Sequence, residues 1–116
     1  MPRKHPSGGV DSLSKGQLSR FFLKKATEWP DGTAVVPVDQ ERTSIVREAF
    51  SDDVHGKGPG AIAAYWQRQI FSGRGVPPLV KGSDAQVLDY VRSTPGAIGY
   101  VGASTPTEGV KVLTVE

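Results

Sequence analysis

The sequence contains no cysteine, which excludes disulfide bonds, thiolate metal sites and a cysteine nucleophile. It has no apolar run near the roughly 18 residues that a membrane-spanning helix needs. The first eleven residues, MPRKHPSGGVD, lack the apolar core of a signal peptide. An excess of one charge is also missing, since 14 Lys and Arg face 12 Asp and Glu. We therefore expect no membrane span, no signal peptide in this chain and no binding driven by bulk charge.

The composition is that of an ordinary globular domain. The 116 residues are 37% hydrophobic and 22% charged, and this length suits a single core. The 14 Gly and 9 Pro lie between apolar segments and indicate many turns. Residues 1–11 have no hydrophobic periodicity, so we predict a flexible N-terminal arm followed by one α/β domain over residues 12–116.

Four segments have the apolar spacing of helices. The first begins with a capping box formed by Ser14 and Gln17 and runs through FFLKK. The second begins at Thr43 or Ser44 and ends before Gly56. A third starts at Pro59 and repeats apolar residues every four positions, and a fourth starts after a capping box of Ser83 and Gln86 and stops near Ser93. The apolar residues that define the third helix are Ile62, Trp66 and Ile70, with Tyr65 and Phe71 beside them.

Strands are predicted near residues 34–38, within AIGYV at 97–101 and within VKVLTV at 110–115, with a short extended piece ending near Val80. In the second of these, Ala97, Gly99 and Val101 share one face, while Ile98 and Tyr100 share the other. The first face permits close approach of a helix, and the second fills core or cleft. Helices between strands predict an α/β layer architecture with a parallel crossover.

Four quoted segments, read in order, carry a family resemblance: LSRFFLKKATEWPDGTAVVPVD, REAF, AYWQRQIFSGRG and TPGAIGYV. Together they resemble the phosphate-type periplasmic solute-binding proteins of ABC transporters, in particular small single-lobe relatives. The resemblance covers about residues 5–115. It implies one lobe of a type II periplasmic-binding-protein-like fold, with a small mixed sheet flanked by about four helices.

The resemblance also implies a function and a location. Full-length members close two lobes around an anion held by backbone amides and hydroxyl groups, so the expected ligand is a small oxyanion such as phosphate. Expected partners are a second lobe or another copy of the chain and an ABC permease, and the expected location is periplasmic or otherwise exported. Relatives carry an export signal and a first apolar strand before a segment like HPSGGVDSLS, whereas only MPRK precedes it here. Either that strand is missing, or the assigned start codon lies too far downstream.

The start of the second helix is the best candidate anion site. Free amides and the helix dipole attract anions there, Arg42 adds positive charge, and Thr43 and Ser44 add hydroxyls. The same serine and threonine are ordinary N-caps, so capping alone also explains them. Relatives have a glycine-rich loop at this position, and DQERTSIVREAF lacks those glycines.

Two glycine-rich loops are weaker candidates. SGRGV could lay Arg74 and its amides along a ligand, or it could simply end the third helix. HGKGPG lacks the preceding strand and the Lys-Ser or Lys-Thr of a nucleotide phosphate loop.

Catalytic, metal and nucleic-acid sites are not predicted. No G-x-S-x-G sequence occurs, so we expect no enzyme and no cofactor. Asp52 and His55 could approach a metal, but a histidine in the last turn of a helix is explained by the helix dipole. The basic first helix contains Phe21 and Phe22, whose spacing places them in the core rather than against bases.

Two functions remain open from the sequence. The first is a solute-binding domain that holds an oxyanion weakly or with a partner lobe. The second is a protein-interaction or signalling module that keeps this fold without a ligand.

Overall fold

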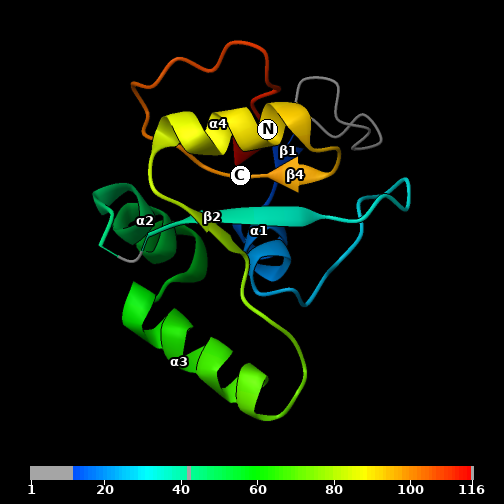
Figure 1. Ribbon diagram of the computed structural model, residues 1–116, viewed down its shortest axis with the longest axis vertical. Coiled ribbons are helices and arrows are strands. Elements are labelled where there is room, and N and C mark those ends of the chain that lie inside the picture. The colour runs from blue at the N-terminus through cyan, green and yellow to red at the C-terminus, as the bar shows by residue number, and fades with distance from the viewer. Residues whose placement is uncertain (1–11, 42, 116) are drawn as a thin grey trace.

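The computed structural model describes residues 12–41 and 43–115 (Figure 1). The predicted arm at residues 1–11 lies outside these ranges. In chain order the elements are β1 (Ser12–Leu13), α1 (Lys15–Phe22), β2 (Val36–Gln40), α2 (Ile45–Phe50), the π-helical turn η1 (Ser51–His55), α3 (Pro59–Phe71), β3 (Leu79–Lys81), α4 (Asp84–Ser93), β4 (Ala97–Ile98) and β5 (Thr114–Val115).

The strands form two small parallel sheets. One sheet has the order β3-β2-β4, and the other is the pair β1-β5. Val38 of β2 is opposite Leu79 of β3, and Pro37 is opposite Ile98 of β4. Outside these two sheets, Glu28 and Ala34 form an isolated antiparallel bridge. These features confirm the predicted α/β fold class with about four helices.

Two hydrophobic clusters fill the two sides of the β3-β2-β4 sheet. Figure 1 shows α4 on one side of β2 and β4 and α1 on the other. On the α1 side, Phe22, Trp29 and Ile98 belong to one buried cluster. On the α4 side, Val38 and Val91 belong to the second. The apolar residues of α1 and α4 therefore face the sheet, as the helical spacing predicts.

The segment TPGAIGYV turns from α4 into β4, as predicted. Gly96 has φ +87°, which suits glycine in this tight turn. A Cβ at Gly99 would lie 2.6 Å from Cγ1 of Val87, so only glycine allows α4 to approach this closely. The opposite face of the segment carries Ile98, which is 1% exposed. The predicted division into a helix-facing side and a core-facing side is confirmed.

The helix starts follow the capping prediction with one difference. Ser14 and Gln17 form a complete capping box at α1, and Ser44 is the N-cap of α2. Ser83 caps α4, but the Gln86 side chain accepts a hydrogen bond from the amide of Gly82 instead of completing a capping box.

The strand boundaries differ from those predicted. β2 begins and ends two residues later than predicted, and the polar side chains of Asp39 and Gln40 at its end are buried with hydrogen-bond partners. Of the strand predicted at 110–115, only Thr114–Val115 is observed as β5. Val110 and Leu113 are buried, and their spacing of three residues fits a loop that anchors two side chains better than a strand.

The apolar face of α3 is only partly buried, contrary to its continuous spacing. Ile62 and Trp66 are buried, whereas Ile70 and Phe71 are 54% and 88% exposed. Figure 1 explains the difference, because α3 projects away from the sheet and its last turn has no layer beside it. None of the helices in the described ranges combines the length and apolarity needed to cross a membrane.

Candidate functional site

Polar side chains gather where β2 ends and α2 begins. β2 is the middle strand, and it ends with Asp39 and Gln40, which are 6% and 2% exposed. Ser44 follows as the N-cap of α2. Ligands of open α/β sheets commonly bind beyond the carboxyl ends of the strands. This junction is therefore the candidate site.

Ser44 already makes two hydrogen bonds within the protein. Its Oγ accepts from the amide of Arg47 at 3.3 Å and donates to Oε1 of Gln40 at 3.2 Å. Thr43 is exposed beside it, and Ile45 at the first position of α2 is 84% exposed. Arg42 lies outside the described residues. The first amides of any helix have no partner within the helix, and in α2 the amide of Arg47 is satisfied by Ser44.

Arg47 is the described cation at this junction, and it is held inward. Its Nη1 donates to the carbonyl of Gln40 at 3.0 Å, and its Nε lies 3.5 Å from Oδ1 of Asp39. The two side chains are only 12% and 9% exposed. An internal carboxylate therefore neutralises this guanidinium.

Tyr100 connects the same carboxylate to the aromatic core. Its hydroxyl donates to Asp39 and accepts from the amide of Gln40 at 3.1 Å. Its ring stacks on Phe50 with centroids 3.8 Å apart and an interplanar angle of 5°. Burial first, and then the negative charge of Asp39, raise the pKa of Tyr100 well above its ordinary value. Tyr100 is thus a neutral hydrogen-bond donor at any physiological pH.

Asp84, at the start of α4, ties together three segments of the chain. It accepts hydrogen bonds from Nε2 of Gln40 at 2.8 Å, the amide of Gly102 at 3.1 Å and Oγ1 of Thr105 at 2.5 Å. Burial alone would raise the pKa of Asp84, but the hydrogen bonds from Thr105, Gln40 and Gly102 outweigh it and lower the pKa. This carboxylate fixes the loop after β4 against β2.

The titratable side chains of the junction already have hydrogen-bond partners within the protein. The buried carboxylate of Asp39 and the partly exposed one of Asp84 both accept hydrogen bonds, and the phenol of Tyr100 stays protonated. The hydroxyl of Thr43 is exposed, whereas an oxyanion would compete with Asp39 for the guanidinium of Arg47.

The predicted site residues are only partly brought together. Thr43 and Ser44 lie side by side before α2. Arg74 lies on an exposed loop, where its amide donates to the carbonyl of Gln69 at 2.9 Å. Figure 1 shows this loop leaving the end of α3 that is remote from α2, so Arg74 does not join the junction in this structure.

His55 is held by a serine hydroxyl. Its Nδ1 lies 2.6 Å from Oγ of Ser19, and burial lowers its pKa. Asp53, close to it in sequence, pairs with Lys15 at 2.7 Å. Among residues 12–41 and 43–115, no three His, Asp or Glu side chains are grouped to hold a metal.

Sequence reasoning did not single out Arg47, Asp39 or Gln40, and it placed Tyr100 only on a face that fills core or cleft. A signal was present, because Asp39 and Gln40 directly follow the apolar run that predicts β2. Polar residues at the carboxyl end of a central strand are typical of a site or of a buried network. The contribution of Tyr100 depends on a contact between residues 61 positions apart, which no local pattern indicates.

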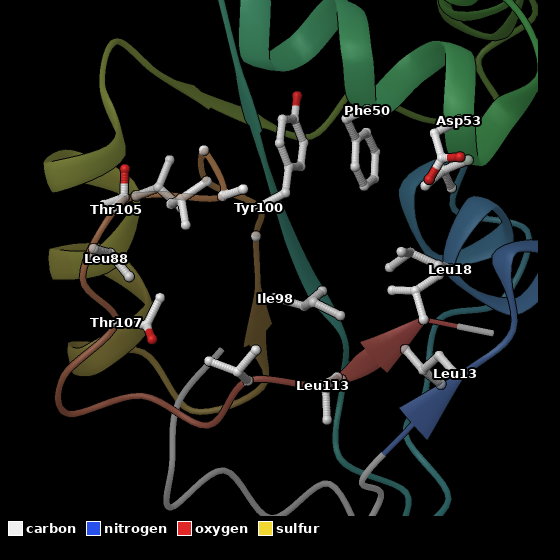
Figure 2. Close-up of a pocket in the computed structure, with 18 residues that line it drawn as sticks. Leu13, Leu18, Phe50, Asp53, Leu88, Ile98, Tyr100, Thr105, Thr107 and Leu113 are labelled. Carbon is white, nitrogen blue, oxygen red and sulfur yellow. The ribbon is translucent and has the colours of Figure 1, made fainter.

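An apolar groove of about 350 Å³ lies between the two sheets (Figure 2). Its lining includes Ile98 and Tyr100 together with Leu13 and Leu113. Thr43 and Ser44 are not among its lining residues. The groove therefore adjoins the polar junction at Tyr100 but does not include the proposed anion-binding residues.

The architecture matches a fragment of a periplasmic-binding-protein fold. A protein from Clostridium perfringens, assigned as a phosphate ABC transporter substrate-binding protein and solved with bound phosphate, is similar over 99% of this chain with a TM-score of 0.77. The sequences are 22% identical, and the match spans 42% of the length of that protein. No family model and no curated protein matches the sequence. The similarity thus defines the fold.

Proposed function

We propose that this chain is a non-catalytic solute-binding domain that holds a small oxyanion such as phosphate, either weakly or together with a second lobe. The binding site is the start of α2. The exposed Thr43, the Ser44 N-cap and the first amides of the helix supply hydrogen-bond donors there. Arg42, in the same segment, supplies positive charge.

The observation that carries this proposal is the fold match. The whole chain is similar to part of a protein solved with phosphate, and the junction lies at the carboxyl end of the central strand, where such folds bind ligands. By the same similarity, we propose a role in ABC-type transport, a permease as partner and an exported or periplasmic location.

A second lobe is needed for tight binding. Ligand sites bury most of the ligand surface, whereas Thr43 and Ile45 here lie on an open side of the molecule. The inward pairing of Arg47 with Asp39 also removes one cation from easy reach of a ligand. We therefore expect an affinity for phosphate that is weak in the isolated chain.

Calorimetric titration with phosphate, and with sulfate for comparison, tests the proposal at low salt. Ser44→Ala should reduce phosphate binding. Ser83→Ala is the matched control, because Ser83 caps α4 through the same contact, accepting from the amide of Gln86 at 3.2 Å. Both variants lose one N-cap, worth about 1 kcal/mol of stability. Equal phosphate binding by both variants and the native chain would refute the assigned site.

A protein-interaction module is the second candidate function, and one surface feature favours it. Exposed large apolar side chains recur along the sequence from the end of α3 into β3. They are Ile70, Phe71, Val76, Leu79 and Val80. Clustered exposed apolar residues of this kind mark interaction surfaces. Self-association that Phe71→Ser abolishes, without phosphate binding, would favour this function over the first.

A further inference from the structure

The last turn of α3 and the loop after it form one protruding unit, residues 68–76, which we call the α3 tip. The chain reverses there, because Gly73 has φ +70° and the amide of Arg74 donates back to a carbonyl of α3 at 2.9 Å. A Cβ at Gly75 would lie 3.9 Å from the ring of Trp66, so the loop folds back onto the helix. Figure 1 shows this end of α3 standing away from the sheet. The tip is therefore a compact projection of the molecule.

Three large apolar side chains of the tip are exposed to solvent. Ile70, Phe71 and Val76 are 54%, 88% and 64% exposed. Side chains of these types are usually buried, and removing them from water is favourable. A surface that covers the tip is therefore stabilised by the burial of these three side chains.

The surroundings of the tip are basic. Residues 55–83 contain four of the 14 Lys and Arg and none of the 12 Asp and Glu, so this stretch carries +4 and the other residues together carry −2. Arg68 and Arg74 are exposed, and neither forms an ion pair within the part of the chain that the structure describes. Lys25 adds charge from the side of α1, where its Nζ lies 5.5 Å from the ring centroid of Tyr65 on α3. Exposed apolar side chains and unpaired cations thus occupy the same projection.

We propose that the α3 tip docks on an anionic lipid surface, with Ile70 and Phe71 inserted at the boundary between headgroups and acyl chains and with Arg68 and Arg74 bound to lipid phosphates. Apolar side chains beside cations are typical of segments that lie in this boundary. Guanidinium groups bind phosphate oxygens through paired hydrogen bonds, and their stems lie along apolar surface. The 13 residues of α3 are too few to span a bilayer, so the contact is a surface contact.

The shape and charge of the tip favour a lipid surface over a protein partner. A protein must offer a matching hollow for a projecting aromatic ring, whereas a headgroup layer accepts the ring without one. An open hollow on this chain, lined by Glu41, Lys81 and Asp89 among others, is a poor counterpart for the tip of a second copy. Lys81 repels the arginines of the tip, and Arg92 already pairs with Asp89 at 3.1 Å.

Docking through the tip leaves the polar junction accessible. The tip lies at the end of α3 that is remote from α2 (Figure 1). The helix itself, at 13 residues, is about 20 Å long. The inference goes beyond the proposed function and does not depend on it, because no part of it involves the oxyanion.

Sedimentation of the full chain with lipid vesicles tests the inference at low salt. The chain should sediment with vesicles of equal parts phosphatidylglycerol and phosphatidylcholine, and added salt should weaken this binding by screening the arginines. Vesicles of phosphatidylcholine alone are the lipid control, and they should bind the chain about tenfold or more weakly.

Matched substitutions separate the tip from the rest of the surface. Phe71→Ser removes an exposed ring, so folding should be retained, and it should weaken vesicle binding about tenfold or more. Ile45→Ser is its control, because Ile45 is 84% exposed and lies on α2. Arg74→Gln should weaken binding about fivefold. Lys57→Gln is its control, because Lys57 precedes the opposite end of α3, and charge acts on a lipid surface over only about 10 Å.

Four results would overturn the inference. They are no sedimentation with the anionic vesicles, equal binding to both kinds of vesicle, equal effects of each substitution and its control, or a dimer formed without lipid that Phe71→Ser abolishes and that does not sediment with vesicles. The last result would identify a second copy of the chain as the partner of the tip. Phosphate binding is measured separately, so its presence or absence leaves this test unchanged.

Discussion

The guanidinium of Arg47 and the carboxylate of Asp39 form an ion pair inside the protein, with Nε 3.5 Å from Oδ1. Asp39 ends the central strand, and Arg47 lies on the helix that follows it. The pair therefore joins β2 to α2 at the proposed binding site. An arriving oxyanion meets a cation that already has a partner, which is one physical reason to expect weak binding by the isolated chain.

Removing one member of this pair should be strongly destabilising. Arg47→Met leaves the buried carboxylate of Asp39 without its cation, and breaking a buried pair in this way costs about 3–5 kcal/mol. Urea unfolding at neutral pH measures the loss. The double variant Asp39→Asn with Arg47→Met should be more stable than Arg47→Met alone, because it leaves no buried charge. If the double variant lost as much free energy of unfolding as Asp39→Asn and Arg47→Met lose together, this account would be contradicted.

Gly99→Ala should destabilise the fold through the contact between β4 and α4. The new Cβ would lie 2.6 Å from Cγ1 of Val87, so the helix must shift at a cost of roughly 1–3 kcal/mol. Gly75→Ala is the control, since its Cβ would meet the Trp66 ring at 3.9 Å, an ordinary contact. Adding Val87→Ala should recover part of the Gly99→Ala loss in thermal unfolding. Equal melting temperatures for the two glycine variants would show that the close approach is wrong.

Asp84→Asn should reduce stability at neutral pH by roughly 1–3 kcal/mol, because the charged acceptor of three hydrogen bonds is lost. The folded-state pKa of Asp84 is lowered, so its contribution is complete above the unfolded-state value of 3.8 and disappears as pH falls through the folded-state pKa. The difference between native chain and variant should therefore narrow below about pH 4. Denaturant unfolding across this range measures it, and a difference that is constant with pH would contradict the assignment.

His55 should make stability depend on pH at higher pH values than Asp84 does, between about pH 5 and pH 7. Burial lowers its folded-state pKa, with Arg47 and Lys57 adding to the effect and Asp39 opposing it. The unfolded chain then binds the proton more readily. Stability from this group is complete above the unfolded-state pKa of 6.5 and falls as pH drops below it. His55→Gln should flatten the curve between about pH 7 and pH 5, and an unchanged slope in the variant would exclude this histidine as its cause.

The sequence predicted those parts of the fold that local chemistry decides. Ser14 and Ser44 begin helices because their side chains accept from nearby amides, and Gly99 marks a close approach. The exposure of Phe71 could not be predicted, because helical spacing shows which residues share a face but not whether another layer covers it. The interaction of Tyr100 with Asp39 depends on the paired strands, and so it required the structure.

The most direct test of the central claim is a phosphate titration followed by NMR at low salt. The proposed function predicts that the amides of Thr43 to Val46 shift in a saturable way with phosphate, that sulfate shifts them differently, and that Ser44→Ala weakens the effect. No saturable shift at these amides with either anion, in a chain whose spectrum shows it to be folded, would contradict an oxyanion site at the start of α2.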